Sequence, residues 1–89
     1  MDQDRLSARE VVRRGSEIYE RDLRARAEHE HWGEFLILDI DTGDYEVDPD
    51  ELNAVKRAMA KRPEGVRYLV RVGYPAAHRL GGRFLVSEP

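Results

Sequence analysis

The chain contains no cysteine, so disulfides, thiol catalysis and thiolate metal sites are all excluded. Long apolar runs are also missing, and the longest one, Phe35–Leu38, is far too short to cross a bilayer. The first ten residues, MDQDRLSARE, lack the apolar segment of a secretory signal. A chain of 89 residues has room for one hydrophobic core. We therefore expect a single soluble domain, residues 1–89, in the cytoplasm and without a membrane partner.

Charge is abundant but segregated along the chain. The formal net charge is −3, from 15 Lys and Arg against 18 Asp and Glu. Residues 33–55 contain acids but no Lys or Arg, whereas residues 56–83 contain Lys and Arg with Glu64 as their only acid. This asymmetry favours head-to-tail self-association or a partner that contacts one charged side. The alternative is a well-solvated surface that carries charges of both signs.

The N-terminal third predicts a helix from residue 7 to residue 30. Ser7 and Glu10 have the spacing of a capping box, in which each side chain satisfies a free backbone N–H. Apolar residues then recur at three- and four-residue steps as a narrow stripe, which comprises Ala8, Val11, Val12, Gly15, Ile18, Tyr19 and Leu23. Gly15 in mid-helix costs about 1 kcal/mol relative to Ala. A stripe this narrow predicts a helix that packs on a neighbouring surface.

Residues 33–87 predict a β-β-α-β core. We expect a strand at 35–40, a turn at 41–44 and a strand at 45–47. A helix follows, with Asp48 as N-cap and Pro49 at its first position, and residues 63–65 end it. The last core strand is expected at 66–72. The fold class is therefore α+β, with sheet order 2-1-3 and the first strand antiparallel to both neighbours. A short fourth strand at 83–86 is expected on a sheet edge.

The two faces of this sheet are expected to receive different helices. Alternation places Tyr68, Val70 and Val72 on one face of the last core strand, and Leu69 with two arginines on the other. We expect the second helix to cover the valine face. The N-terminal helix, from this chain or from a second copy, is the expected cover for the Leu69 face. A homodimer through this helix or through the open sheet face is therefore the expected assembly.

Asp41-Thr42-Gly43 is the active-site tripeptide of retroviral-type aspartic proteases, in which it also follows an apolar strand. Those enzymes need two such loops so that two carboxylates share a proton. Their pattern continues with a small residue, where this chain has Asp44, and their fold is rich in strands. We interpret the tripeptide as a hairpin turn and expect no catalytic residue. An aspartic hydrolase is the third functional hypothesis.

Two further stretches resemble metal sites. The acids between Asp39 and Glu51 are as dense as in a calcium loop, but Gly43 and Asp50 fall at the fifth and twelfth positions. An EF-hand needs Gly at the sixth position and Glu at the twelfth. His29 and His31 lie two residues apart at a helix end and so point in different directions. We expect neither a metal nor a cofactor.

The stretch RVGYPAAHRLGG, residues 71–82, contains most of the expected partner-binding residues. We expect Gly73 to end the strand, 74–75 to form a turn, 76–80 to form one helical turn and 81–82 to reverse the chain. Flat aromatic rings and bidentate guanidinium groups are typical of binding hot spots. The candidate residues are Arg71, Tyr74, His78, Arg79 and Arg83. The alternative is that Arg71 and Arg79 only form ion pairs with acids such as Glu28 or Glu34.

Several short motifs keep a fixed order and spacing along residues 15–83. They comprise Tyr19, Glu20, Leu23, Arg24, Glu28, His31, Gly33, Phe35, Asp41 to Tyr45 and Arg71 to Ala77. In these positions the chain resembles a family of small bacterial proteins, notably cyanobacterial, that has no established activity. The resemblance implies no catalytic residue. Members are similar to the small first partners of two-gene cassettes that include retropepsin-like or toxin-like proteins.

These observations lead to two leading hypotheses about function. We expect a non-enzymatic protein-interaction module, antitoxin-like, whose partner is the product of a neighbouring gene. The alternative is a small nucleic-acid-binding or regulatory protein, since a basic strip with Tyr74 is formed by Arg67, Arg71, Arg79 and Arg83. The net negative charge opposes this alternative. Salt separates the two hypotheses, because binding to phosphates weakens steeply as salt rises.

Overall fold

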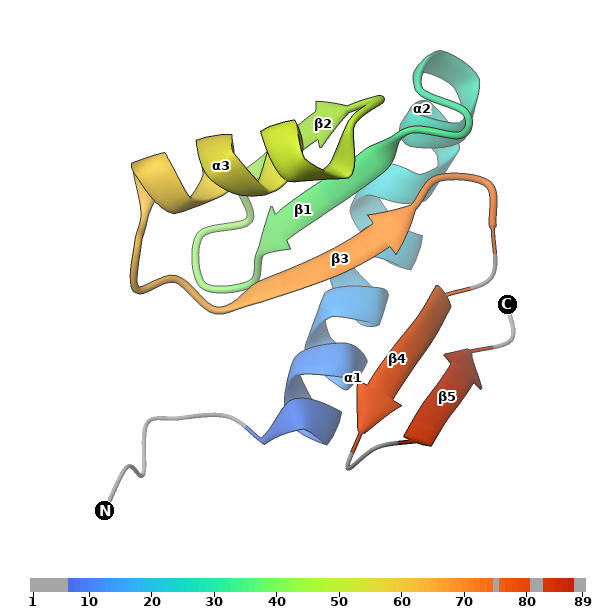
Figure 1. Ribbon diagram of the computed structural model, residues 1–89. Coiled ribbons are helices and arrows are strands. Elements are labelled where there is room, and N and C mark those ends of the chain that lie inside the picture. The colour runs from blue at the N-terminus through green and yellow to red at the C-terminus, as the bar shows by residue number, and fades with distance from the viewer. Residues whose placement is uncertain (1–6, 75, 81–82, 88–89) are drawn as a thin grey trace.

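The computed structural model describes residues 7–74, 76–80 and 83–87, with side chains up to Tyr74. Along these residues the chain forms α1 (Ala8–Ile18), η1 (Tyr19–Leu23), α2 (Arg24–Glu30), β1 (Phe35–Asp39), β2 (Tyr45–Asp48), α3 (Glu51–Lys61), β3 (Arg67–Arg71), β4 (Ala76–Leu80) and β5 (Arg83–Ser87) (Figure 1). The α+β class, the N-terminal helix and the β-β-α-β order are confirmed.

The main sheet has the order β2-β1-β3, with β1 antiparallel to both neighbours, as predicted. Its register places Phe35 opposite Asp48 on one side and opposite Arg71 on the other. The nearly continuous apolar run of β1 therefore lies in the middle position. This position buries a strand on both faces, and Leu36, Ile37 and Leu38 are at most 3% exposed.

The last two strands differ from the prediction. Residues 76–80 form strand β4 and not a helical turn, and β4 pairs with β5 in a separate two-stranded sheet. The expected fourth strand exists, but its backbone bonds go to β4 and not to an edge of the main sheet. The chain reverses between Leu80 and Arg83 as expected, while residues 81–82 themselves lie outside the described residues. A pairing partner supplied by the next segment overrides the local preference of a short polar stretch.

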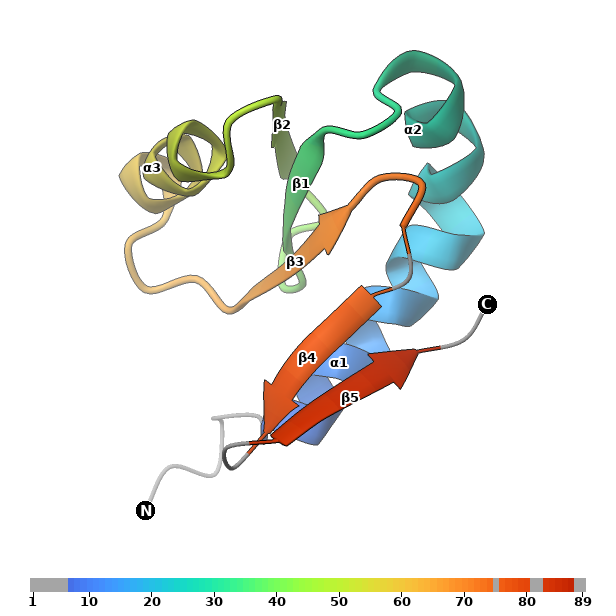
Figure 2. The same cartoon turned by 45° about the vertical axis from the view of Figure 1, so that its right-hand side comes forward.

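The segments α1, η1 and α2 follow one another without a break and cover one face of the main sheet, with α3 on the other side (Figure 2). Ser7 caps α1, because its Oγ accepts the N–H of Glu10 at 3.1 Å. The core between this helix and the sheet contains Tyr19, Ala27, Leu36, Leu38, Tyr68, Val70 and Val72. The N-terminal helix thus packs on the sheet of its own chain.

The assignment of helices to sheet faces was wrong. The N-terminal helix, and not α3, lies on the face of Tyr68, Val70 and Val72. Carboxylates from β1 and β2 occupy the other face, where they bind the basic side chains of α3. This face suits α3, because only the small Ala54 is fully buried on the sheet while the half-exposed Arg57 and Lys61 reach the carboxylates, and it would leave the apolar stripe of α1 without partners. The prediction failed because it weighed only the apolar residues of each helix.

Helix α3 begins two residues later than predicted. Its N-cap is Asp50, whose Oδ1 accepts the N–H of Leu52 at 2.9 Å. Asp48 remains in β2, and its Oδ1 accepts the N–H of Asp50 at 2.7 Å. The first carboxylate therefore orders the turn and the second caps the helix, so that the pair of acids around Pro49 serves both ends of the connection.

The wide turn η1 keeps the inner residues of the helix on one face. Gly15, Tyr19, Leu23 and Ala27 recur at every fourth residue, and in a regular α-helix such a series drifts around the axis. A π-type turn takes more residues per turn, and here the N–H of Arg24 bonds to the carbonyl of Tyr19. The drift is thereby reduced, and Tyr19 and Ala27 are both buried.

Gly15 is the point of closest approach between α1 and β3. A Cβ built on Gly15 would lie 2.3 Å from Cγ of Tyr68 and 2.6 Å from its Cβ. Real Cβ atoms do not approach a neighbour so closely, so any larger residue at this position must push the helix away from the sheet. This contact explains a glycine that helix propensity alone disfavours.

We predict that Gly15→Ala destabilises the protein by about 1–3 kcal/mol, the usual cost of overpacking a core. Helix propensity alone predicts the opposite sign, a gain of about 1 kcal/mol. Thermal unfolding followed by circular dichroism measures the difference, with Arg14→Ala on the exposed side of the same turn as the control. An increase in the thermal midpoint for Gly15→Ala would contradict the packing argument.

Candidate partner-binding surface

Two glycines shape the chain where β3 leaves the sheet. Gly33 precedes β1 with a φ of 83°, and Gly73 follows β3 with a φ of 89°. The N–H of Gly33 donates to the carbonyl of Val72 at 2.9 Å, and the N–H of Val72 donates to the carbonyl of Glu34 at 2.8 Å. A Cβ on Gly73 would lie 2.8 Å from the Trp32 indole. Gly73 is therefore required both by its backbone angle and by the ring that packs on it.

Arg71 is held in place by a backbone carbonyl and two aromatic rings. Its Nε donates to the carbonyl of Gly33 at 3.0 Å. Its guanidinium carbon lies 4.3 Å from the centre of the Tyr74 ring and 5.2 Å from the centre of the Phe35 ring. Such cation–π contacts contribute about 0.5–1 kcal/mol each at exposed sites. We call Trp32, Phe35, Arg71 and Tyr74 the aromatic–arginine cluster.

The aromatic–arginine cluster is open to solvent. Trp32 is 62% exposed and Tyr74 is 48% exposed, although both side chains are large and mostly apolar. Among the residues whose side chains are described, Arg71 has no carboxylate partner. Arg71 is therefore an oriented cation that stacks on the exposed Tyr74 ring, and Arg with Tyr or Trp is a combination enriched at binding hot spots.

The acids named as alternative partners of Arg71 are engaged elsewhere. Glu28 accepts from Nε of Arg24 at 2.8 Å, and Glu34 lies 3.2 Å from Nδ1 of His31. The alternative of an ion pair between Arg71 and one of these acids is therefore wrong for Arg71. For Arg79 the side chain lies outside the described part of the chain.

The structure brings only some of the candidate residues together. Arg71 and Tyr74 meet in the cluster, whereas the backbones of His78 and Arg79 belong to β4 and that of Arg83 to β5, in the second sheet. Sequence analysis missed Trp32 and Phe35. Trp32 is the only tryptophan of the chain and directly precedes a glycine, which was a usable signal. The contact of Phe35 with Arg71 depends on strand register and could not be read from spacing.

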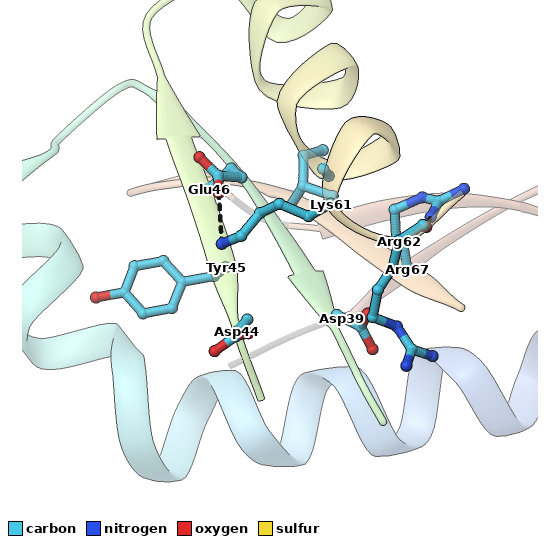
Figure 3. A pocket seen from close by; sticks show the side chains of 9 residues that line it. Asp39, Asp44, Tyr45, Glu46, Lys61, Arg62 and Arg67 are labelled. Carbon is cyan, nitrogen blue, oxygen red and sulfur yellow. Dashed lines mark hydrogen bonds and ion pairs between the residues drawn. The ribbon is translucent and has the colours of Figure 1, made fainter. Parts of the chain in front are cut away.

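A pocket of about 280 Å³ lies between the C-terminal half of α3 and the strands β1 and β2 (Figure 3). Its charged side chains largely neutralise one another. Nζ of Lys61 lies 2.8 Å from Oε2 of Glu46, and Nε of Arg62 lies 2.7 Å from Oδ2 of Asp39. These pairs hold α3 on the sheet, and the pocket presents no excess of either charge to a ligand.

The ionic contacts of α3 also shift pKa values. Hydrogen bonds from Lys61 and Arg57 lower the pKa of the Glu46 carboxyl below its ordinary value. The backbone N–H of Asp50 and the guanidinium of Arg57 lower the pKa of Asp48. Carboxylates with lowered pKa values stabilise the fold above their ordinary pKa, and this contribution is lost as pH falls through the lowered values. These acids therefore have a structural role.

The Asp41-Thr42-Gly43 tripeptide forms the turn between β1 and β2, as interpreted. The carboxylate that orders the turn belongs to Asp39, whose Oδ1 accepts the N–H groups of Asp41 at 2.9 Å and Thr42 at 3.3 Å. Gly43 has a φ of 83° and donates its N–H to the carbonyl of Asp39 at 2.8 Å. Asp41 is exposed and lies 3.2 Å from Nη2 of Arg62. The turn is therefore ordered by Asp39, which precedes the tripeptide, and not by the Asp41 carboxylate.

Within residues 7–74, 76–80 and 83–87, no three His, Cys, Asp or Glu side chains are grouped closely enough to hold a metal ion. No helix in the same part of the chain is long and apolar enough to cross a bilayer.

We predict that Asp39→Ala lowers the free energy of unfolding by about 1–3 kcal/mol. The substitution leaves the N–H groups of Asp41 and Thr42 and the Nε of Arg62 without their acceptor. The matched variant Asp41→Ala removes only an exposed ion pair and should cost less than about 1 kcal/mol. Urea unfolding of both variants compares the two costs. An equal loss at both positions would contradict the assignment of the turn to Asp39.

Comparisons of the chain with protein-family models, curated proteins and solved structures gave no match. A functional interpretation therefore rests on the geometry of the chain itself. On that basis the aromatic–arginine cluster is the best candidate for a functional site, because it combines exposure, oriented polar groups and a charge that no described carboxylate compensates.

Proposed function

We propose that the chain is a non-enzymatic protein-interaction module that binds the product of a neighbouring gene, in the manner of an antitoxin. The observation that supports it is the aromatic–arginine cluster, in which Arg71 stacks on the exposed Tyr74 ring and has no carboxylate partner among the side chains that the structure describes. Trp, Tyr and Arg are the residues most enriched at hot spots of protein interfaces.

The fixed conformation of the Arg71 side chain in the cluster favours tight binding. Arg71 already bonds to the Gly33 carbonyl and stacks on Tyr74, so little side-chain freedom remains to be lost when a partner binds. Its Nη atoms remain available to bind a carboxylate on the partner, with the geometry that guanidinium groups prefer. We propose that His78, Arg79 and Arg83 extend this surface along β4 and β5.

We predict that Trp32→Ala combined with Tyr74→Ala abolishes capture of the native partner. Both rings are exposed, so the thermal midpoint should move by less than about 4 °C. The matched control replaces two exposed residues of other surfaces, Arg26→Ala with Lys56→Ala, and should keep full capture. Co-purification with the products of adjacent genes, expressed together with the tagged chain, is the measurement.

The same experiment tests the nucleic-acid alternative. Partner capture that survives nuclease treatment and moderate salt supports the protein-interaction module. Capture that is lost on nuclease treatment, or that falls steeply with salt, would instead support binding to nucleic acid. Full capture by the Trp32 and Tyr74 double variant would contradict our assignment of the surface.

We also propose that the chain forms a homodimer. The helix at residues 8–30 packs on the sheet of its own chain, so the surface proposed for the contact is α3, where Leu52 and Met59 are 59% and 46% exposed two turns apart.

We predict a dimer in sedimentation velocity at micromolar concentration, because burial of this apolar pair favours association. The double variant Leu52→Lys with Met59→Lys should be a monomer. Arg14→Ala with Arg26→Ala, two exposed positions on the N-terminal helix, is the control and should sediment as the wild type does. A monomeric wild-type chain would contradict the dimer.

A further inference from the structure

The edge of β3 that faces away from β1 has no strand partner among the described residues, and of its outward groups the carbonyl of Arg71 accepts from the N–H of Tyr74 at 3.1 Å. The carbonyl of Val66 accepts from Ile40 at 3.1 Å, and the N–H of Val72 donates to Glu34 at 2.8 Å, so the even-numbered residues of this segment bond to β1. The backbone groups of Arg67, Leu69 and Arg71 therefore point away from β1. Within the part of the chain that the structure describes, β3 pairs with β1 alone.

The opposite edge of the sheet is closed by a side chain. The N–H of Asp39, at the end of β1, bonds to the carbonyl of Asp44, which directly precedes β2. The even-numbered residues of β2 therefore bond to β1, and the odd-numbered ones face outward. The outward carbonyl of Val47 accepts from Nη2 of Arg57 at 2.8 Å. The same guanidinium binds Glu46 at 3.0 Å and Asp48 at 2.9 Å. An incoming strand would have to displace this network, which is a common way of protecting a sheet edge.

The side chains of the β3 edge combine one apolar residue with two cations. Arg67, Leu69 and Arg71 lie on the same face at alternate positions, and Leu69 is 41% exposed. Arg67 donates to the carbonyl of Arg62 at 2.8 Å, and Arg71 donates to the carbonyl of Gly33 at 3.0 Å. Among the described side chains neither forms an ion pair with a carboxylate, because Asp39, opposite Arg67, is bound by Arg62.

We propose that the β3 edge binds an extended acidic segment of the partner protein as an added strand. An acid-x-apolar-x-acid pattern would place its carboxylates opposite Arg67 and Arg71 and its apolar residue on Leu69. The backbone of Leu69 would supply main-chain hydrogen bonds, as in other cases of strand addition. This inference rests on the proposed function, since it names the partner chemistry of the same surface through Arg71.

Charge argues against a second copy of the chain at this edge. A symmetric antiparallel pair centred on Leu69 would place each Arg67 directly opposite Arg71 of the other copy, and like charges at such positions are destabilising. The next strand of the same chain does not fill the edge either. β4 follows after residues 72–75 but pairs with β5 and contacts α1. An acidic strand from another protein is the occupant that the exposed groups fit.

The test uses the whole chain and the synthetic peptide acetyl-Thr-Glu-Thr-Val-Thr-Glu-Thr-amide, with Lys in place of both Glu in the control peptide. We expect titration calorimetry to detect the acidic peptide and not the basic one. We expect the amide hydrogen of Leu69 to exchange quickly in the free chain and to become protected when the acidic peptide binds. The exchange of Leu36, in the centre of the sheet, is the internal control.

Two changes to the hydrogen-bonding groups make the test specific. Leu69→Pro removes an outward N–H without breaking a bond to β1, as proline is tolerated on an edge, and should weaken peptide binding by about tenfold or more. Leu69→Thr loses part of the apolar contact but keeps the N–H, so it should bind at least about threefold more tightly than Leu69→Pro. N-methylation of the peptide at Val should weaken binding as Leu69→Pro does. This modified peptide keeps the test valid if the Leu69→Pro variant does not fold.

Several outcomes would overturn the proposal. The first is that the acidic peptide does not bind at millimolar concentration. The second is that neither N-methylation nor Leu69→Pro changes the affinity for the peptide. The third is that the Leu69 amide is already protected from exchange in the free chain. None of these outcomes decides the proposed function, which has its own experiment. That experiment compares capture of the native partner by the wild type and by the Trp32 and Tyr74 double variant. Full capture by that double variant, with intact peptide binding by the wild type, would overturn the proposed role of the cluster alone.

Discussion

The close packing of α1 on β3 at Gly15 is the contact on which the rest of the structure depends. With no side chain between them, the helix backbone and the Tyr68 ring approach closely enough for Tyr19 and Ala27 to reach the sheet as well. A protein of this size has a small core, so the loss of one close contact removes a large fraction of its apolar burial. The position of α1 also decides which face of the sheet remains for α3.

The two faces of the sheet are held by different forces. One face is apolar and nearly dry, and it supplies the stabilising burial. The other carries Asp39, Glu46 and Asp48, which match the basic residues on the inner side of α3. Partly exposed ion pairs contribute little free energy each. Their main effect is selectivity, because a helix docked on the wrong face would leave several charges without partners.

Much of the fold follows from local patterns in the sequence. The alternation of residues 66–72, the apolar run of β1 and the capping signals at Ser7 are strong because each has a direct physical cause. The sheet order followed from the apolar run of β1, which favours the middle position, and the crossover through α3 makes β2 and β3 parallel. The assignment of faces failed because it depends on charge contacts that join carboxylates of β1 and β2 to basic residues in and directly after α3, and local patterns do not show such contacts. The pairing of β4 with β5 was equally invisible to local patterns.

The candidate site was predictable only in part. Arg71 and Tyr74 were found because they are close in sequence, whereas Phe35 reaches Arg71 only through the strand register. Trp32 adds a practical consequence. It is the only tryptophan in the chain, it is mostly exposed, and its indole packs on Gly73 beside Arg71 and Tyr74. The intrinsic fluorescence of the unlabelled protein therefore comes largely from this corner of the molecule, which gives the surface its own built-in optical reporter.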